Sequence, residues 1–465
     1  MDKATVVGSG PNGLAAAVTL ARAGLNVTVL EAADEVGGGT RSGEVTLPGL
    51  IHDQCSGIHP LAVDNAFSRS VDLAGHGLSW TWPEVQYSHP LEAGAGAAVY
   101  RDVNHTAGAL GKDAAVWRSV FGPLARSFAD VTEDFLRPMI HVPDHPVKLA
   151  RFGAVAGMPV SVTARLLRTP EGRALFGGVA AHAFRPFHTL ASSAVGAALG
   201  TAAHTFGWPA AVGGSAAISD AMVGVLESHG GRVETGVRLR SLSDVPDSGS
   251  SCWTPPPEPP STSPGTSCPR QCLGRCPVSG TVRAPSPCIS PSKVVFRGRI
   301  CRPARLEQSM SAAASRRRRW RSGRSTGAPC RRNRSCWVTQ QSVADPTRAR
   351  GGVHPVDTYA HVPAGFTGDA TAAIIARIEE YAPGFRDRIV ATTVWNVRHI
   401  EDANPNYIEG DIVTGANSRA NCCSARGSPS TRTAQGRAVS TCVPQPPRRV
   451  PEPTACAVTT RHCPR

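Results

Sequence analysis

The first 31 residues contain the pattern that most restricts how this chain can fold. An apolar run predicts a strand over 3–7, and the turn Gly8-Ser9-Gly10-Pro11-Asn12-Gly13 follows it directly. We expect a helix from Asn12 to Ala23, ended by Gly24, and a second strand from Asn26 to Leu30 that ends at Glu31. A strand, G-x-G-x-x-G, a helix, a strand and an acid in this order are typical of a dinucleotide-binding βαβ unit.

Each of these positions has a physical task in such a unit. Gly8 permits the tight turn, Gly10 lets the backbone approach a pyrophosphate, and Gly13 lets the helix pack against the strand. The helix N-terminus supplies amide donors and partial positive charge for the phosphates. Glu31 is placed to accept a hydrogen bond from an adenosine ribose hydroxyl. The plainer alternative is a glycine-rich turn with a surface glutamate.

A second glycine cluster narrows the choice of cofactor. Gly37-Gly38-Gly39-Thr40-Arg41-Ser42 follows Glu31 closely, and here the chain resembles flavoproteins with two dinucleotide-binding domains, which usually bind FAD. The resemblance implies that Gly38 and Gly39 pass close to the flavin nucleotide and that Arg41 contacts it. An ordinary surface cation is the alternative for Arg41.

Further segments resemble a narrower family. The stretches 53–60, 98–102 and 121–124 are similar to the phytoene dehydrogenase-related oxidoreductases of the carotenoid desaturase and isomerase type. The resemblance implies an FAD-binding domain with a long inserted substrate domain. The helix-like, Ala- and Leu-rich stretches over 114–199 would then cover an apolar ligand, although a helical subdomain that binds nothing would have the same composition.

The resemblance also covers two later motifs. Residues 208–215, followed by an amphipathic helix over 216–228, are similar to the family's proline and double-glycine motif. This implies that Gly213 and Gly214 approach the cofactor and that Val233 lies near the adenine; a simple helix-start turn is the alternative. Residues 404–418 are similar to a loop between substrate and flavin, with a plain surface turn as the alternative.

Outside 247–337 and 419–465, the chain shows no clear catalytic group. We find no Ser-His-Asp, Cys-x-x-Cys or metal constellation there, so we predict no metal site. His59, beside the flavin by resemblance, is the one weak candidate for an acid or base, and a packing or capping role is its alternative. Cys55 is interpreted as a small buried apolar residue, because no cysteine lies near it in the sequence.

Charge and cysteine are concentrated in two segments. Thirteen of the 14 cysteines fall in 247–337 and 419–465, whose net charges are +14 and +7, so the remaining 327 residues carry −7. Only nine of the 91 residues in 247–337 are Leu, Ile, Val or Phe, which is below the roughly 20 % needed to bury a core. Taken literally, this stretch is a disordered basic linker.

Two functional interpretations of the linker remain open beside that one. Cys268, Cys272 and Cys276 have a C-x₃-C-x₃-C spacing, but they lack the paired C-x₂-C or histidine ligands of a zinc module. The run from Arg316 to Arg321 would attract polyanions, as any such run does. We expect no specific nucleic-acid partner.

A change of reading frame explains both segments better. Codons allowed for Cys252 to Glu258 spell Leu-Asp-Thr-Ala-Pro-Arg in another frame, and those ending at Trp337 spell Glu-Pro-Phe-Val-Leu, which continues into Val338. The same offset turns Asn421 to Arg426 into Glu-Leu-Leu-Phe-Arg-Pro, and the codons up to His462 into Met-Cys-Gly-Tyr-His-Ala. The four windows predict frameshifted coding DNA, through miscalled bases or a decaying gene.

These observations predict an α/β fold: a doubly wound, Rossmann-like FAD-binding domain with an inserted α+β substrate domain. The segments are the first half of the FAD-binding domain (1–50), the substrate or lid domain (51–200), the FAD-binding continuation (201–246), the out-of-frame linker (247–337), the rest of the substrate domain (338–418) and an out-of-frame tail in place of the C-terminal FAD-binding segment (419–465). We expect 247–337 to contribute no strand to either sheet. We also expect the chain as written to bind flavin weakly or not at all and to be poorly soluble.

The predicted activity is that of an FAD-dependent oxidoreductase, a dehydrogenase, desaturase or isomerase, on an apolar, polyene- or lipid-like substrate with an unknown electron acceptor. A flavin amine oxidase and a non-enzymatic nucleic-acid binder are the alternatives. No apolar run reaches the roughly 18 residues of a membrane helix, and Met1-Asp2-Lys3 lacks the order of a signal peptide. We therefore expect a cytoplasmic protein, with peripheral membrane contact possible.

Overall fold

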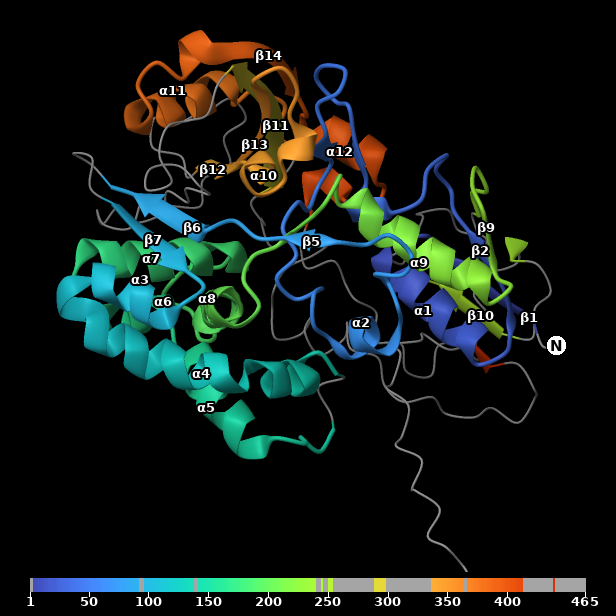
Figure 1. The fold of residues 1–465 in the computed structure, drawn as a ribbon, viewed down its shortest axis with the longest axis horizontal. Coiled ribbons are helices and arrows are strands. Elements are labelled where there is room, and N and C mark those ends of the chain that lie inside the picture. Colours follow the sequence, from blue (N-terminus) through green and yellow to red (C-terminus); the bar gives the residue numbers. More distant parts are fainter. Residues whose placement is uncertain are drawn as a thin grey trace, which may run out of the picture.

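The computed structural model describes residues 3–91, 96–137, 141–239, 244–245, 250–253, 288–297, 336–362, 366–412 and 438–439. Figure 1 shows these residues in three regions: a sheet with α1 and α9 near the N-terminus, a group of helices from α3 to α8, and a second sheet with α11. We call them the nucleotide-binding region, the helical region and the antiparallel region.

The nucleotide-binding region is built on a parallel sheet with the strand order β15-β10-β1-β2-β9. The strands are β1 (Lys3–Val7), β2 (Asn26–Leu30), β9 (Arg232–Glu234), β10 (Ser250–Trp253) and β15 (Ala438–Val439). Helices α1 (Pro11–Arg22) and α9 (Ala216–Ser228) lie side by side against this sheet (Figure 1). Leu14 and Val18 of α1 are buried in one core with Ile218 and Val225 of α9, so the apolar face of each helix is used.

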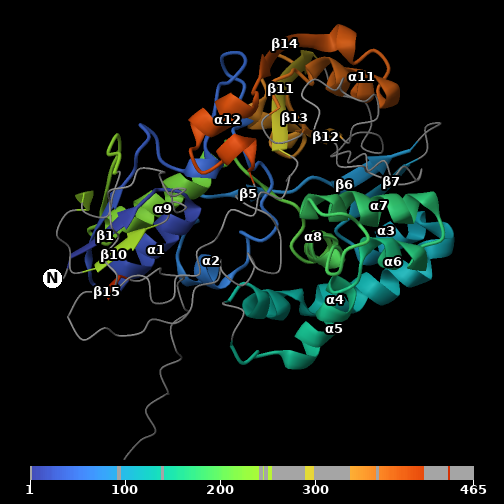
Figure 2. The ribbon, with the colours of Figure 1, turned by 180° about the vertical axis from the view of Figure 1, so that it is seen from behind.

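The helical region lies between β2 and β9 in the chain, as an insertion predicts. It contains α3 (Val103–Ala109), α4 (Ala114–Phe135), α5 (Pro146–Ala156), α6 (Val160–Thr163), α7 (Pro170–Ala180), α8 (Ser193–Thr205) and the hairpin β6 (Val85–Pro90) with β7 (Gly96–Tyr100). Its position beside the first region is seen from behind in Figure 2. Gly196 lets α8 approach α7 closely, because a Cβ there would lie 2.8 Å from the Cβ of Ala180.

The antiparallel region contains a sheet in the order β12-β13-β11-β14. The strands are β12 (Cys336–Thr339), β13 (Val353–Val362), β11 (Cys288–Arg297) and β14 (Ile389–Val394), and α11 (Thr371–Tyr381) packs on β13. Shorter elements connect the regions: α2 (Ala66–Ser70), α10 (Gln341–Ala344), α12 (Val397–Ala403), and the pairs β3 (Ser42–Gly43) with β4 (His52–Asp53) and β5 (Trp80–Thr81) with β8 (Ala210–Ala211).

The sequence-based fold class is confirmed: a Rossmann-like α/β domain carries an inserted second domain. One part of the prediction is wrong. Residues 247–337 do contribute strands, since β10 pairs with β1, β11 lies between β13 and β14, and β12 begins at Cys336. Strand pairing uses backbone amides and carbonyls, which any sequence offers, so poor side-chain composition did not prevent it. The other predictions for 254–287, 298–335 and most of 419–465 lie outside the described residues.

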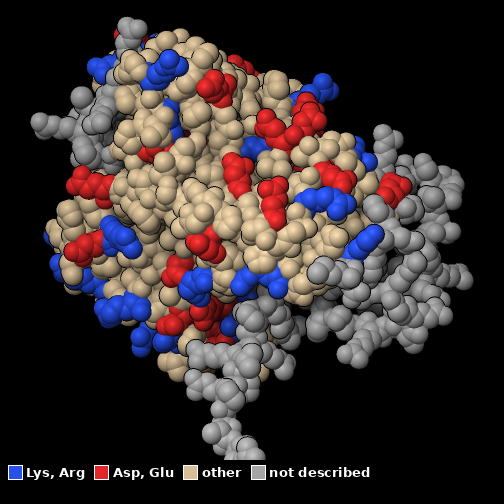
Figure 3. Space-filling model, turned by 45° about the vertical axis from the view of Figure 1, so that its right-hand side comes forward, with Lys and Arg blue, Asp and Glu red and all other residues tan. Residues whose placement is uncertain are grey.

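The surface of the described residues has mixed charge. Lys and Arg side chains lie among Asp and Glu side chains across the face in Figure 3. Within the described part of the chain, no helix has the length and apolar character needed to span a membrane.

Candidate functional site

The glycine turn after β1 leaves open backbone at the start of α1. Gly8 has a φ of +96°, and its amide donates to the carbonyl of Leu30 at 2.8 Å, which ties the turn to β2. Gly10 is the N-cap of α1, and no described side chain caps the helix. A Cβ at Gly10 would meet nothing within 4 Å, so the space beside the helix start is not filled by described protein atoms. Gly13 is buried, as the predicted packing on the strand requires.

Glu31 lies where the sequence pattern predicts, at the end of β2, and is largely buried. Its carboxylate accepts hydrogen bonds from the Ser9 amide (2.8 Å), the Ser9 hydroxyl (2.6 Å) and the Ala33 amide (2.9 Å). Burial alone would raise the pKa of Glu31, but these hydrogen bonds outweigh it, and the pKa lies below its ordinary value. Two donors reach Oε2 and one reaches Oε1, so Oε1 has lone-pair capacity for a further donor.

Arg41 is held by the chain beside Glu31. Its guanidinium donates to the carbonyls of Glu35 (2.8 Å), Val36 (3.3 Å) and Ala403 (3.1 Å), and Nη2 lies 3.7 Å from the Glu31 carboxylate. A guanidinium has five N–H groups, so this arrangement leaves donors for a ligand. The contact with Ala403 was not predictable from the motif, since Ala403 is 362 positions away in the chain.

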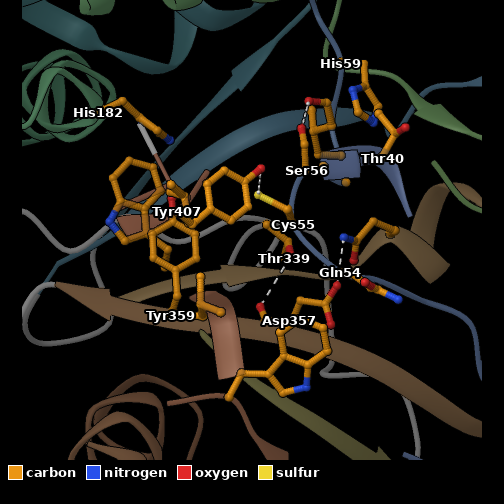
Figure 4. Close-up of a pocket in the computed structure, with 18 of the residues that line it drawn as sticks. Thr40, Gln54, Cys55, Ser56, His59, His182, Thr339, Asp357, Tyr359 and Tyr407 are labelled. Atoms are coloured by element: carbon orange, nitrogen blue, oxygen red, sulfur yellow. Dashed lines mark hydrogen bonds between the residues drawn. The ribbon is translucent and has the colours of Figure 1, made fainter. Parts of the chain in front are cut away.

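The loop of Gly38 and Gly39 packs tightly on its surroundings. A Cβ at Gly38 would lie 3.2 Å from the Cα of Gly10, and a Cβ at Gly39 would lie 2.6 Å from the hydroxyl of Tyr407. That hydroxyl donates to the sulfur of Cys55 at 3.5 Å (Figure 4). Cys55 is therefore not the buried apolar residue that we expected, because it is part-exposed and lines a cavity.

The turn of Gly213 and Gly214 leads into α9, with φ values of +79° and +127° that favour glycine. The Gly213 amide donates to Asp345 at 2.7 Å, and a Cβ at Gly214 would lie 2.8 Å from the Cβ of Ser42. Val233 pairs with Val29 in the sheet, so it lies at the strand beside β2. The predicted cofactor contacts of these three residues stay predictions.

His59 lies at the cavity wall in a hydrogen-bonded position. The Ser215 hydroxyl donates to the Ser56 carbonyl at 2.7 Å, so the hydrogen bond of 2.8 Å between Ser215 and His59 Nε2 has His59 as its donor. Burial lowers the pKa of His59 to about 4, against the opposing charge of Asp53. His59 is thus neutral near pH 7 with its Nε2 proton engaged, which is the geometry of the packing alternative.

A buried ion network that sequence analysis missed joins the antiparallel region to β4 and to the segment from β8 to α9. Arg348 donates to Asp53 (2.5 Å), to Asp345 (3.1 Å) and to the carbonyl of Ala211 (2.6 Å), and the side chains of Arg348 and Asp53 are both 0 % exposed. Asp53 also accepts from the Ser215 amide at 2.7 Å. No local pattern marks Arg348, because its partners are up to 295 positions away.

A cavity of about 590 Å³ runs between the three regions. One end, which we call the nucleotide end, is lined by Pro11, Gly38, Gly39 and Thr40. The other, the aromatic end, is lined by His182, Leu199, Trp208, Trp337 and Tyr359. Figure 4 shows His182 across the cavity from Thr40, with Cys55 and Tyr407 between them. Asn404, Tyr407 and Ile412 of the predicted substrate-side loop also line the wall.

The aromatic end is made by rings that pack on one another. Trp337 and Tyr359 stack with ring centroids 5.4 Å apart and an interplanar angle of 7°. His182 meets Trp337 edge-on, with ring centroids 3.5 Å apart. Burial lowers the pKa of His182 to about 3, so this histidine is neutral at physiological pH. Asp357 is the acid in the described lining, and its carboxylate is bonded to His52 (2.7 Å) and Gln341 (3.1 Å).

The sheet, the glycine turn and the adjoining cavity define a protein with a Rossmann-like nucleotide-binding domain and a second domain that covers it. Comparison with known proteins agrees: residues 6–72 match the family described as NAD(P)-binding Rossmann-like domain. No curated protein matches the sequence.

Solved structures extend the likeness over most of the chain. Putrescine oxidase bound to putrescine is similar with a TM-score of 0.52 and 16 % identity, over 85 % of this chain and 85 % of that one. The PF1083 protein from Pyrococcus furiosus is similar with a TM-score of 0.50 and 13 % identity, over 84 % of this chain and 88 % of that one. At these identities the likeness shows the fold, which is one used by oxidoreductases. The narrower resemblance to phytoene dehydrogenase-related enzymes stays a prediction.

Proposed function

We propose that this protein is built as an FAD-dependent oxidoreductase for an apolar substrate. The observation that carries the proposal is one cavity with two unlike ends, since Pro11 of α1 and the Gly38 to Thr40 loop line one end and aromatic rings line the other. A nucleotide cofactor fits the first end and an apolar molecule the second.

The residues present fit an FAD group. The unfilled space beside Gly10 and the uncapped start of α1 suit a pyrophosphate, which amide donors would hold. Oε1 of Glu31 suits a ribose hydroxyl, and the free donors of Arg41 suit the flavin nucleotide. Gly213, Gly214 and Val233 are proposed to line the rest of the cofactor site.

When bound, FAD supplies the redox chemistry, taking up the hydride that the substrate loses. The chain's own residues would bind and orient the cofactor and the substrate. The stacked rings of Trp337 and Tyr359 exclude water from the aromatic end and offer a flat apolar surface. The Arg348 network fixes the Gly213 to Ser215 turn against β4, because Asp345 and Asp53 each accept one amide of that turn.

The lining favours an apolar substrate over a charged one. Asp357 already accepts from His52 and Gln341, so an ammonium ion would have to share this carboxylate with both of them. The likeness to putrescine oxidase supports amine oxidation as a second candidate, with aromatic rings as the amine-binding surface. Turnover of amines rather than polyenes would favour that candidate.

A substitution at Gly10 tests the cofactor proposal. Gly10→Val should raise the FAD dissociation constant by at least about tenfold, because the side chain fills the pyrophosphate space while its φ of −65° is accessible to valine. Gly153→Val on α5 is the matched control, since a Cβ there also meets nothing within 4 Å. Equal FAD affinity in Gly10→Val and in the unsubstituted chain would contradict the proposal.

A substrate test follows on the flavin-loaded protein. Anaerobic bleaching of the flavin absorbance should follow addition of a conjugated polyene and not of putrescine. The reverse result would support the amine oxidase instead.

We propose in addition that the coding DNA is frameshifted around 247–337 and 419–465, which would leave the chain as written with weak flavin binding. The Arg348 network supports this, because fully buried charges join residues before 247 to residues after 337 as parts of one protein. Resequencing across the codons of Pro246, Trp337 and Ser418 tests the proposal, and an unchanged read together with stoichiometric flavin in the purified protein would overturn it.

A further inference from the structure

The two ring nitrogens of His182 are used differently from each other. It lies in the short 3-10 helix Ala181–Ala183 that follows α7, and its Nδ1 is 3.0 Å from the carbonyl of Val179. A carbonyl only accepts, so Nδ1 carries the proton and Nε2 presents a lone pair. Among the described residues, none forms a hydrogen bond to Nε2 of His182.

His204 is the contrasting case on the neighbouring helix α8. Trp117 donates to its Nε2 at 3.0 Å, and its Nδ1 is bonded to the carbonyl of Arg101 at 3.3 Å. Both nitrogens of His204 are therefore satisfied by the protein, as expected for a histidine that serves packing. His182 has one nitrogen fixed by the protein and one that lines the cavity.

The surroundings make this lone pair selective. The ring of Trp337 meets the His182 ring edge-on, with ring centroids 3.5 Å apart, and the centroid of the Trp208 ring is 6.5 Å from that of His182. The acceptor is therefore set in an apolar wall. Burial keeps the ring neutral by lowering the pKa of His182 to about 3, so Nε2 remains an acceptor at physiological pH. A ligand that fills this end without a donor would leave the acceptor dry and unpaired.

We propose that Nε2 of His182 is a specificity-determining acceptor, and that the cavity takes a planar apolar molecule carrying one hydroxyl at its end in the aromatic wall. The inference rests on the proposed function, because it names the substrate class of the same cavity. Figure 4 shows His182 on the side opposite Thr40, so the hydroxyl would lie away from the nucleotide end. The reacting bond would then lie toward Cys55 and Tyr407, between the two ends.

Three small probes test the assignment without flavin or turnover. 2-Naphthol donates a hydrogen bond, 2-methoxynaphthalene has the oxygen but no donor, and naphthalene has neither. In equilibrium dialysis at pH 7.5 the full chain should bind 2-naphthol about five- to tenfold more tightly than the other two, the effect of one net hydrogen bond. His182→Phe keeps an aromatic ring and should reduce the preference to less than about twofold.

Two further variants keep the test decisive. His182→Gln restores an acceptor and should recover part of the preference, while circular dichroism shows whether each variant is folded. Tyr359→Phe removes a hydroxyl at the same end that could also accept a hydrogen bond, and it should leave the preference in place. Absence of saturable 2-naphthol binding to the chain, or a preference that survives in His182→Phe or disappears in Tyr359→Phe, would overturn the assignment.

The outcome of the His182 test can be told apart from the outcome of the FAD-binding test of the proposed function. A donor preference that depends on His182 in a protein that binds no FAD would keep the acceptor and reject the flavoenzyme. FAD binding that depends on Gly10, without any donor preference, would do the opposite.

Discussion

The two ends of the cavity are built in different ways. The nucleotide end comes from Pro11 and the Gly38 to Thr40 loop, which are close in the sequence and act through their backbone. The aromatic end comes from His182, Trp208, Trp337 and Tyr359, which belong to separate segments and act through their side chains. Backbone geometry is encoded locally by glycine, whereas a side-chain wall exists only after distant segments have packed.

The two ends also titrate over different pH ranges. At the nucleotide end, hydrogen bonds from Ser9 and Ala33 lower the pKa of Glu31, so its charged form is favoured. Around the aromatic end and the helical region, burial lowers the pKa of His182 to about 3, and those of His204 and His361 to about 4. Moderate acid is therefore expected to act on the second group alone.

The largest predicted effect is a loss of stability in mild acid. The unfolded chain binds more protons than the folded one between pH 6.5 and about 4, so these histidines stabilise fully above pH 6.5 and progressively less as pH falls. Each should cost about 1–2 kcal/mol between pH 7 and 5. Urea unfolding followed by the fluorescence of Trp117 and Trp208 measures this.

A matched variant sharpens the acid prediction. His182→Phe should lose less stability than the chain itself over the same pH range, because one titrating group is gone. Identical pH profiles for the two proteins would contradict the assignment of acid lability to the aromatic end.

The next effect concerns the buried Arg348 network. Arg348→Met leaves Asp53 and Asp345 buried without their cation, and the free energy of unfolding should fall by about 3–5 kcal/mol. Arg350→Met is the control, since Arg350 is exposed, and it should change the value by less than about 0.5 kcal/mol. Equal urea midpoints for the two variants would show that the regions are not joined by Arg348.

Sequence analysis predicted what depends on neighbours in the chain. It located α1, β2, Glu31 and the Gly213 turn, because glycines, helix ends and apolar runs act within a few residues. It missed Arg348, because nothing in the sequence around this arginine shows that the folded chain places it against Asp53 and Asp345.

Errors arose where pairing overrides composition. β10 and β11 form although the 247–337 segment as a whole is poor in apolar residues. A short run such as Val294-Val295-Phe296 is enough for a strand where β13 and β14 offer edges to pair with. Cys55 was assigned to the core because no cysteine lies near it in the sequence. Its contact with the Tyr407 hydroxyl, 352 positions away, could not be foreseen. Long-range contacts of this kind have no local pattern.

Trp337 tests the boundary of the proposed frameshift. The alternative frame places valine and leucine at 336 and 337, where the structure buries Cys336 and Trp337 at 4 % and 5 % exposure. Apolar residues thus fit β12 in both frames. The double variant Cys336→Val with Trp337→Leu should lose about 1–2 kcal/mol at most, whereas Trp337→Ala should lose about 3 kcal/mol or more. A double variant as unstable as Trp337→Ala would argue that the tryptophan belongs to the native frame.

The smallest effect would reveal whether the nucleotide end is as local as its sequence suggests. Tyr407→Phe removes a hydroxyl that donates to Cys55 at 3.5 Å, a weak bond, so it should cost less than about 1 kcal/mol. The same hydroxyl lies 2.6 Å from where a Cβ on Gly39 would be, while the ring carbon behind it lies at 4.0 Å. Gly39→Ala should therefore be better tolerated in the Tyr407→Phe background, with a coupling of about 0.5–1 kcal/mol in a double-mutant cycle from urea unfolding. Strict additivity would mean that the glycine loop adjusts without Tyr407, and that the motif near Glu31 alone determines the nucleotide end.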